Sequence, residues 1–214
     1  MQALSVLVAV EDLLQDASSV RWPAAQRLRW LNEAQLAIVS VRPDACAKTA
    51  AVTLVAGELQ TLPTDGLRLL DVIGNVGGRR ITLVSRDVMT SLTTSWSTAA
   101  SAVIKHYGHD PMLPREFEVF PSAIVGAQVL ARYSITPPEL TADTQSIALA
   151  DNWKPALVDW ICMRAFLRDT DTADMEKAMA FKSSFTLLVT GKGQADRTAQ
   201  PATSHPNRLK PNPQ

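Results

Sequence analysis

The residues best suited to chemistry lie in one short stretch, "HYGHDPMLPREFE", which holds two of the three histidines of the chain. His106 and His109 stand three residues apart, and Asp110 follows the second histidine. Imidazole and carboxylate groups at this spacing can bind a metal ion when a helix brings them to one face. Gly108 and Pro111 argue against a helix, and no third ligand stands nearby at a recognised spacing. We therefore expect a loop with an Asp-Pro turn that leads into a strand, and no metal or catalytic site.

Other motifs of enzymes are missing from the sequence or have a simpler reading. "GNVGGRR" has the glycines of a phosphate-binding loop but not the GxxxxGK[ST] pattern, and no G-x-S-x-G motif is present. Glu116 and Glu118 would lie on one face of a strand. This spacing resembles a catalytic carboxylate pair, but it is also the ordinary pattern of a solvent-exposed strand face, which is the interpretation that we favour. Arg79 and Arg80 could contact phosphate, but their place in a polar hairpin is the simpler interpretation.

The composition is that of a globular protein without a bias towards nucleic acid or membrane. The 214 residues are 46% hydrophobic and 20% charged, with a formal net charge of zero. No apolar run approaches the roughly 20 residues that span a bilayer, and the first residues lack the basic flank of a signal peptide. We expect the protein to stay in the cytoplasm of the cell that makes it. Cys46 and Cys162 lie outside any metal-binding spacing, so we interpret them as reduced core thiols.

Two helices are predicted at the start of the chain. Apolar residues recur at helical spacing over residues 3–15 and 23–40, and the second segment begins with Pro23 and is closed by Pro43. Two helices with a short polar link form an αα-hairpin. The apolar face that we predict for the first helix consists of Leu4, Leu7, Val8, Leu13 and Leu14.

Two more helices are predicted near the end of the chain. The first covers residues 153–168, and the second begins at a cap provided by Thr172 or Asp174 and stops at Gly191. Four of the thirteen prolines lie in the remaining residues 191–214, which contain almost no large apolar side chain. Such a segment cannot form a core of its own, so we expect an extended tail that is docked on a partner chain. It carries three net positive charges, which leaves the body with three net negative charges.

The middle of the chain, from about residue 49 to residue 136, predicts strands. "REFEVF" and "QVLARYSI" alternate apolar and polar residues, and Gly77-Gly78 stands at a bend between two further strands. We predict an α+β fold: a helical bundle from the N- and C-terminal helix pairs, an inserted antiparallel β-sheet domain and an extended C-terminal tail. The predicted boundaries are 1–46 for the first helix pair, 47–140 for the β domain, 141–190 for the second helix pair and 191–214 for the tail.

Trp96 stands in a long loop rich in serine and threonine, "TSLTTSWSTAAS", and has no obvious core partner. An aromatic side chain in such a loop is either tucked under the sheet or part of an interface, and the sequence leaves both readings open. We therefore name Trp96, with Arg79 and Arg80, as a candidate subunit or tail interface.

In their order along the chain, five segments resemble the head-to-tail adaptor (connector) proteins of tailed bacteriophages. The resemblance runs from about residue 20 to residue 190, and neither residues 96–105 nor the tail take part in it. The segments are "RLRWLNEAQLAIVSVRPDA" (27–45), "GELQTLPTDGLRLLDVIGN" (57–75), "RRITLVSRDVM" (79–89), "HYGHDPMLPREFEVFPSA" (106–123) and "PALVDWICMRAFLRDTD" (155–171).

The resemblance implies a structural virion protein that is not an enzyme and needs no cofactor. Such adaptors form a homo-oligomeric ring, typically a dodecamer, between the portal protein and a downstream tail or neck protein. The ring extends the channel for double-stranded DNA, which passes without specific binding, and a C-terminal segment reaches the portal. The residues of this chain that would do so are Lys192, Arg197, His205, Pro206, Arg208, Leu209, Lys210 and Pro211. The alternatives are another neck or tail-completion protein, such as a stopper or tail terminator, and a non-viral binding module.

Overall fold

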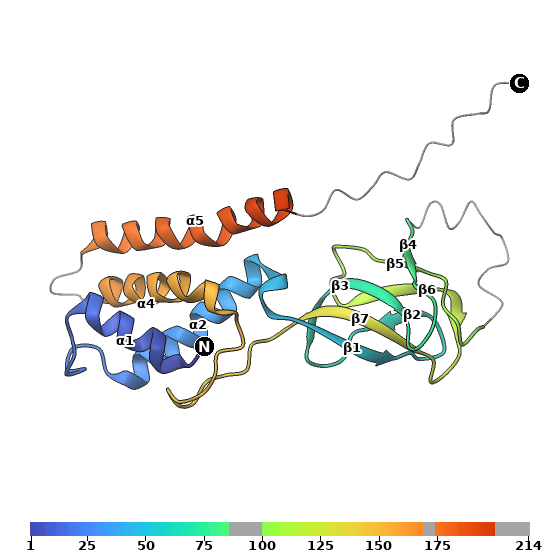
Figure 1. The fold of residues 1–214 in the computed structure, drawn as a ribbon, viewed down its shortest axis with the longest axis horizontal. Helices are drawn as coiled ribbons and strands as arrows, with labels where there is room; N and C mark the ends of the chain where they lie inside the picture. Colours follow the sequence, from blue (N-terminus) through green and yellow to red (C-terminus); the bar gives the residue numbers. More distant parts are fainter. Residues whose placement is uncertain (86–99, 169–173, 200–214) are drawn as a thin grey trace, which may run out of the picture.

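The computed structural model describes residues 1–85, 100–168 and 174–199, with side chains of the last segment described as far as Gly191. The fold is α+β, as the sequence predicts, and it has two parts that lie side by side (Figure 1). One part holds four helices, α1 (Ala3–Leu14), α2 (Ala24–Val41), α4 (Lys154–Arg168) and α5 (Met175–Ala199). The other part holds the strands, and two short 3-10 helices, η1 (Pro43–Cys46) and η2 (Asp151–Trp153), lie on the helical side.

The helices share one hydrophobic core, to which all four contribute. It includes Leu31 of α2, Leu157 of α4 and Phe185 of α5. Helix α4 packs against each of the other three, so that it lies between α5 and the α1–α2 pair. Both cysteines are buried here as free thiols, and burial raises the pKa of Cys162 to about 12, as expected for core thiols.

The predicted apolar face of α1 is wrong in part. Leu4, Val8 and Leu13 are exposed, whereas the buried residues are Ala3, Val6, Leu7, Val10 and Leu14. Helix α1 is apolar around much of its circumference, so periodicity permits several faces. The tertiary structure selects the stripe with heptad spacing, which faces α4.

In the part of the chain that the structure describes, seven strands form two sheets. Their bounds are β1 (Ala47–Thr53), β2 (Gly57–Thr61), β3 (Gly66–Asn75), β4 (Thr82–Leu83), β5 (His106–Gly108), β6 (Glu116–Ala123) and β7 (Gln128–Ile135). One sheet has the order β1-β7-β3 and the other has the order β2-β6-β5-β4. The apolar side chains of the two sheets form a second core. The alternation predicted for β7 is confirmed by the burial of Val129, Ala131 and Tyr133, except that Ser134 of the polar face is buried as well.

The expectation of purely antiparallel pairing is wrong for one pair of strands. Strand β4 runs parallel to β5, with Thr82 opposite His106 and Leu83 opposite Tyr107. Parallel neighbours need a connection of a dozen residues or more, and the long segment between these two strands provides it. The other pairs are antiparallel.

The two parts are joined by the pair β1 and β7. The chain leaves the helices through η1 into β1, and β7 leads it back towards α4 (Figure 1). These two strands pair over seven residues, from Ala47 opposite Ser134 to Thr53 opposite Gln128. Ile135, at the end of β7, packs against both cores. The domain boundaries at residues 46, 140 and 190 stay a prediction.

The prediction that the last helix stops at Gly191 is wrong. Helix α5 continues to Ala199, so residues 191–199 are helical rather than extended. The start of this helix is as predicted, because the carboxylate of Asp174 accepts a hydrogen bond from the Lys177 amide (3.0 Å). A glycine inside a helix costs only about 1 kcal/mol, and the first proline beyond Gly191 is Pro201, so helical hydrogen bonding can extend to Ala199.

A buried arginine, which the sequence does not single out, fastens α1 to α2. Arg27 is only 1% exposed; its Nη2 lies 2.7 Å from a carboxylate oxygen of Glu11 and donates to the Ser19 hydroxyl (2.6 Å). In the connection between α1 and α2, the carboxylate of Asp16 accepts hydrogen bonds from the amide N–H groups of Trp22, Val20 and Arg21. These bonds, above all that from Trp22, hold the pKa of Asp16 below its usual range.

Replacing Arg27 should destabilise the protein strongly, because Glu11 would remain partly buried without its partner. We expect Arg27→Ala to lower the free energy of unfolding by about 3–5 kcal/mol, measured by chemical denaturation. The control is Arg29→Ala, an exposed residue two positions along the same helix, for which we expect a change within about 0.5 kcal/mol. Equal effects of the two substitutions would contradict the role of the buried ion pair.

Candidate functional site

The stretch with the two histidines has the predicted Asp-Pro turn, but its first three residues form strand β5 (His106–Gly108) rather than part of a loop. His109 Nδ1 donates to the backbone carbonyl of Glu116 (3.0 Å), and the carboxylate of Asp110 accepts the amide of Met112 (2.9 Å), which closes the Asp-Pro turn. His106 lies on β5, where it pairs with Phe120 of β6. Among the described residues, no group of three or more His, Cys, Asp or Glu side chains could hold a metal ion.

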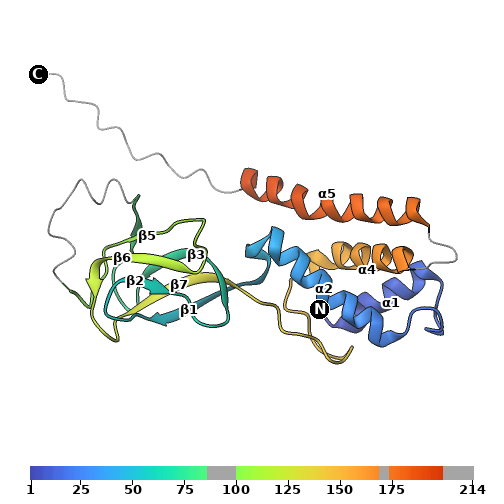
Figure 2. The same ribbon diagram turned by 180° about the vertical axis from the view of Figure 1, so that it is seen from behind.

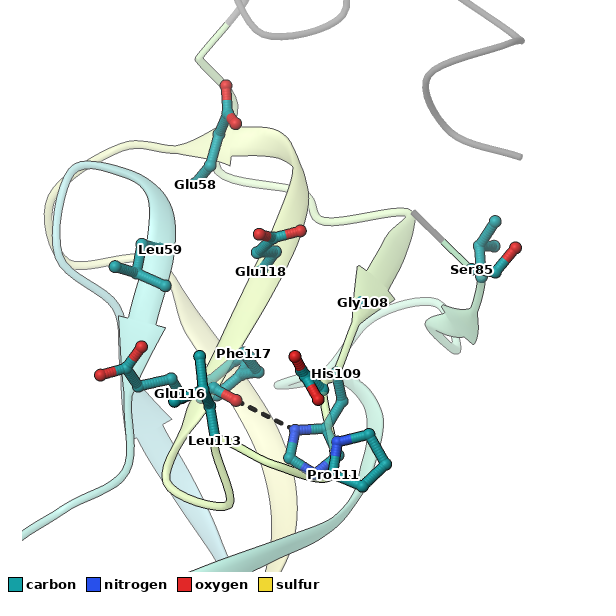
Figure 3. Close-up of a pocket in the computed structure, with 12 residues that line it drawn as sticks. Glu58, Leu59, Ser85, Gly108, His109, Pro111, Leu113, Glu116, Phe117 and Glu118 are labelled. Atoms are coloured by element: carbon teal, nitrogen blue, oxygen red, sulfur yellow. Dashed lines mark hydrogen bonds between the residues drawn. The ribbon is translucent and has the colours of Figure 1, made fainter. Parts of the chain in front are cut away.

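A groove of about 560 Å³ lies beside this stretch (Figure 3). Among the described residues, its lining combines apolar side chains, such as Leu59 and Leu113, with four carboxylates and no lysine or arginine. The carboxylates belong to Glu58, Asp110, Glu116 and Glu118. Glu116 and Glu118 share one face of β6, as the period of two predicts, and both are half-buried.

Ser85, His109 and Asp110 all line the groove, but they are not arranged as a nucleophile, a base and an orienting acid. In such a triad the imidazole Nδ1 donates to the acid, whereas in this groove it donates to a backbone carbonyl. The carboxylate of Asp110 is engaged by the turn instead. Figure 3 also shows Ser85 well apart from the histidine. His109 and Asp110 therefore stabilise the local backbone and are not positioned for acyl transfer.

The predicted interface residues are only partly described. Arg79 and Arg80 are exposed after β3, in a turn that Asn75 holds by donating from its amide N–H and its side-chain Nδ2 to the carbonyl of Arg79 (2.9 and 3.1 Å). Trp96 lies outside the described residues, so its two readings stay open. Lys192 and Arg197 belong to α5, whose side chains are not described beyond Gly191. His205, Pro206, Arg208, Leu209, Lys210 and Pro211 lie outside the described residues.

Two asparagine side chains fix distant segments of the backbone, and the sequence does not reveal them. Asn75 binds the backbone of Ile104, accepting its N–H (2.8 Å) and donating to its C=O (2.7 Å). Asn32 binds the backbone of Leu140 in the same way (3.0 and 2.9 Å). Each amide takes the place of a strand neighbour for a residue far away in sequence. No local pattern marks such an asparagine, because its partner is defined only by the fold.

Tyr107 connects the two sheets. Its hydroxyl donates to the carboxylate of Asp71 on β3 (2.9 Å), so β5 of one sheet is tied to β3 of the other. Burial raises the pKa of Tyr107 to about 12, and the hydrogen bond to Asp71 adds to the shift. The histidine-containing stretch that includes Tyr107 thus holds the two sheets together.

The described residues therefore present an α+β protein whose candidate sites are surfaces. The family model described as SU10 adaptor protein matches residues 1–208. The chain belongs to this family, a family of bacteriophage head-to-tail adaptors, which confirms the resemblance seen in the sequence. Membership implies a structural virion component rather than an enzyme. None of the curated proteins matches the chain. Within the described ranges, no helix has the length and apolarity to cross a membrane.

The Tyr107 hydroxyl should make stability depend on pH in the alkaline range. Unfolded tyrosine titrates near pH 10, so the raised pKa stabilises the fold fully below about pH 10, and this contribution is lost as the pH rises through about 12. We expect Tyr107→Phe to be less stable by about 1–2 kcal/mol at neutral pH and to lose this part of the alkaline dependence, measured by denaturant unfolding. An unchanged alkaline profile in Tyr107→Phe would contradict the assignment.

Proposed function

We propose that this protein is the head-to-tail adaptor of a tailed phage, and that it forms a ring, dodecameric as in similar adaptors, between the portal and the tail. The match of the adaptor family to residues 1–208 is the observation that carries this proposal. It leaves the non-viral binding module without support. A stopper or tail terminator remains the alternative outcome of the experiments below.

The build of the subunit supports a ring. A ring needs two different surfaces on each copy, because its interfaces are head-to-tail and close by rotation. The helical part and the strand part, joined through β1 and β7, provide distinct surfaces along an elongated molecule (Figure 2). The proposed units are residues 1–46 with 141–190 for the helices and residues 47–140 for the strands.

We propose that the C-terminal tail docks on the portal protein. Since α5 runs to Ala199, residues 200–214 are the segment that can reach out, and fifteen residues span up to about 50 Å when extended. This segment is rich in proline and carries Arg208 and Lys210 without an acidic residue. Extended chains bind along the groove of a partner without first forming a core, and copies around a ring add their contacts.

Mass measurement tests the ring. We expect purified protein to form a closed ring of about twelve copies, alone or on addition of the portal protein of the same phage, measured by mass photometry and electron microscopy. Binding to the portal distinguishes an adaptor from a stopper or tail terminator. A monomer that never assembles on the portal would overturn the proposal.

Truncation tests the tail. Removal of residues 200–214 should leave the far-ultraviolet circular dichroism spectrum and ring formation intact but abolish attachment to the portal. The matched control, Arg208→Gln with Lys210→Gln, keeps the length of the tail but removes its two positive charges. It should weaken attachment only by the part of the binding free energy that these charges contribute, and the remaining attachment should depend less on salt concentration. Normal attachment of the truncated protein would reject the docking role.

The DNA channel should be lined by mixed or acidic residues. Strong basic contacts to phosphate would hold the passing DNA through counterion release, and residues 1–190 carry three net negative charges. We expect the assembled ring, examined by electron microscopy, to show no predominance of lysine and arginine on its inner surface. An inner surface lined mainly by these residues would contradict a passive conduit.

A further inference from the structure

A second groove, of about 520 Å³, lies between α2 and the segment after β7. Its apolar lining includes Leu28 and Leu36 of α2 and Pro137 of the returning segment. The two hydrogen bonds between Asn32 and the Leu140 backbone hold that segment against the helix. The groove is therefore a built feature rather than a gap between mobile chains.

The groove contains an unsatisfied acceptor. Gln35 lines it and is only 1% exposed, and its Nε2 donates to Asn32 (3.3 Å). Its Oε1 is buried and has no hydrogen-bond partner within the described residues. A buried amide oxygen without a donor is costly, so the packing beneath this groove is not fully satisfied within the described residues.

The outer surface of α5, by contrast, has its hydroxyl groups already hydrogen-bonded, so that burying it against another protein costs little. Met175, Met179 and Leu187 are exposed, Leu187 to 70%. Three hydroxyl groups of the same helix already donate to backbone carbonyls one turn earlier. Ser183 donates to the carbonyl of Met179, Thr186 to that of Lys182 and Thr190 to that of Thr186. We call the surface formed by Met175, Met179, Ser183, Thr186, Leu187 and Thr190 the outer face of α5.

The groove and the outer face of α5 lie on opposite sides of the helical part. Helix α4 packs between α5 and the α1–α2 pair, and the residues by which α5 reaches the shared core, Phe185 and Val189, are not those of its outer face. In both views α5 forms one edge while the segment after β7 forms the other (Figures 1 and 2). The two surfaces of one chain therefore cannot meet each other. Two different apolar surfaces on opposite sides are what a head-to-tail ring requires.

The charges at the two surfaces are complementary. Arg29 and Glu139 line the groove, and the described residues give neither side chain an ion-pair partner. Helix α5 exposes Glu176 and Lys182, which are likewise unpaired within the described part of the chain. Each surface thus offers one acid and one base to the other.

We infer that the outer face of α5 of one copy docks in the α2 groove of the neighbouring copy. The inference rests on the proposed ring, for which it names the subunit interface. The contact is heterologous, so each copy uses its α5 towards one neighbour and its groove towards the other. Around a ring every α5 and every groove is occupied.

Complementation between two variants tests the inference. Met179→Asp with Leu187→Asp breaks the α5 face and leaves the groove intact, whereas Leu36→Asp breaks the groove and leaves α5 intact. We expect each variant to be monomeric alone, because these side chains are exposed and the fold does not depend on them. Mixed, they should form a 1:1 heterodimer and nothing larger, measured by native mass spectrometry with one variant isotope-labelled.

The control is Val125→Asp, which changes an equally exposed apolar residue in the turn before β7 and should assemble as the wild type does. Circular dichroism of each variant, and the heterodimer itself, report on folding. Rings formed by either interface variant, or a mixture that stays monomeric, would overturn this interface while the ring itself stands. A wild-type protein that forms no ring, even with the portal, would instead overturn the proposed function and the interface with it.

Discussion

The pairing of β1 with β7 is the constraint on which the rest of the structure depends. Strand β7 is the central strand of its sheet, between β1 and β3, yet it is the last strand in the chain. The sheet is therefore completed by a pairing between two segments that are far apart in the sequence. When β7 aligns with β1, it also returns the chain beside η1, so that α4 can pack on α2 although more than a hundred residues separate them. Such a non-local pairing carries a loop-closure cost that the two cores must offset.

Several buried or half-buried polar side chains of this protein connect elements that are far apart in the sequence. Tyr107 ties the sheets to each other through Asp71, Asn75 and Asn32 bind distant backbone segments, and Arg27 joins two helices through Glu11. A buried polar group is costly when it has no partner, and each of these side chains finds a partner on an element that arrives from elsewhere in the chain. For a member of an adaptor family this is consistent, because its function lies in surfaces that meet other proteins.

Much of the fold could be predicted from periodicity, but three features could not. The face of α1 was ambiguous because Leu4 and Val8 are as apolar as the residues that are buried. The end of α5 was placed at Gly191 because glycine often ends helices, whereas its cost inside a helix is small enough to be exceeded by the hydrogen bonds that follow. The parallel pair of β4 and β5 is invisible locally, since strand direction depends on the path of a long connection.

The sequence by itself determined the α+β class, the order of the helices and of most strands, and the reduced state of the cysteines. These follow from side-chain types and their spacing, which act over a few residues. Only the tertiary structure decided which apolar stripe of each helix is buried, which asparagine binds which backbone, and that the α2 groove and the outer face of α5 lie on opposite sides. Those features depend on contacts between residues far apart in sequence, and they exist only once β1 and β7 have brought the two ends of the chain together.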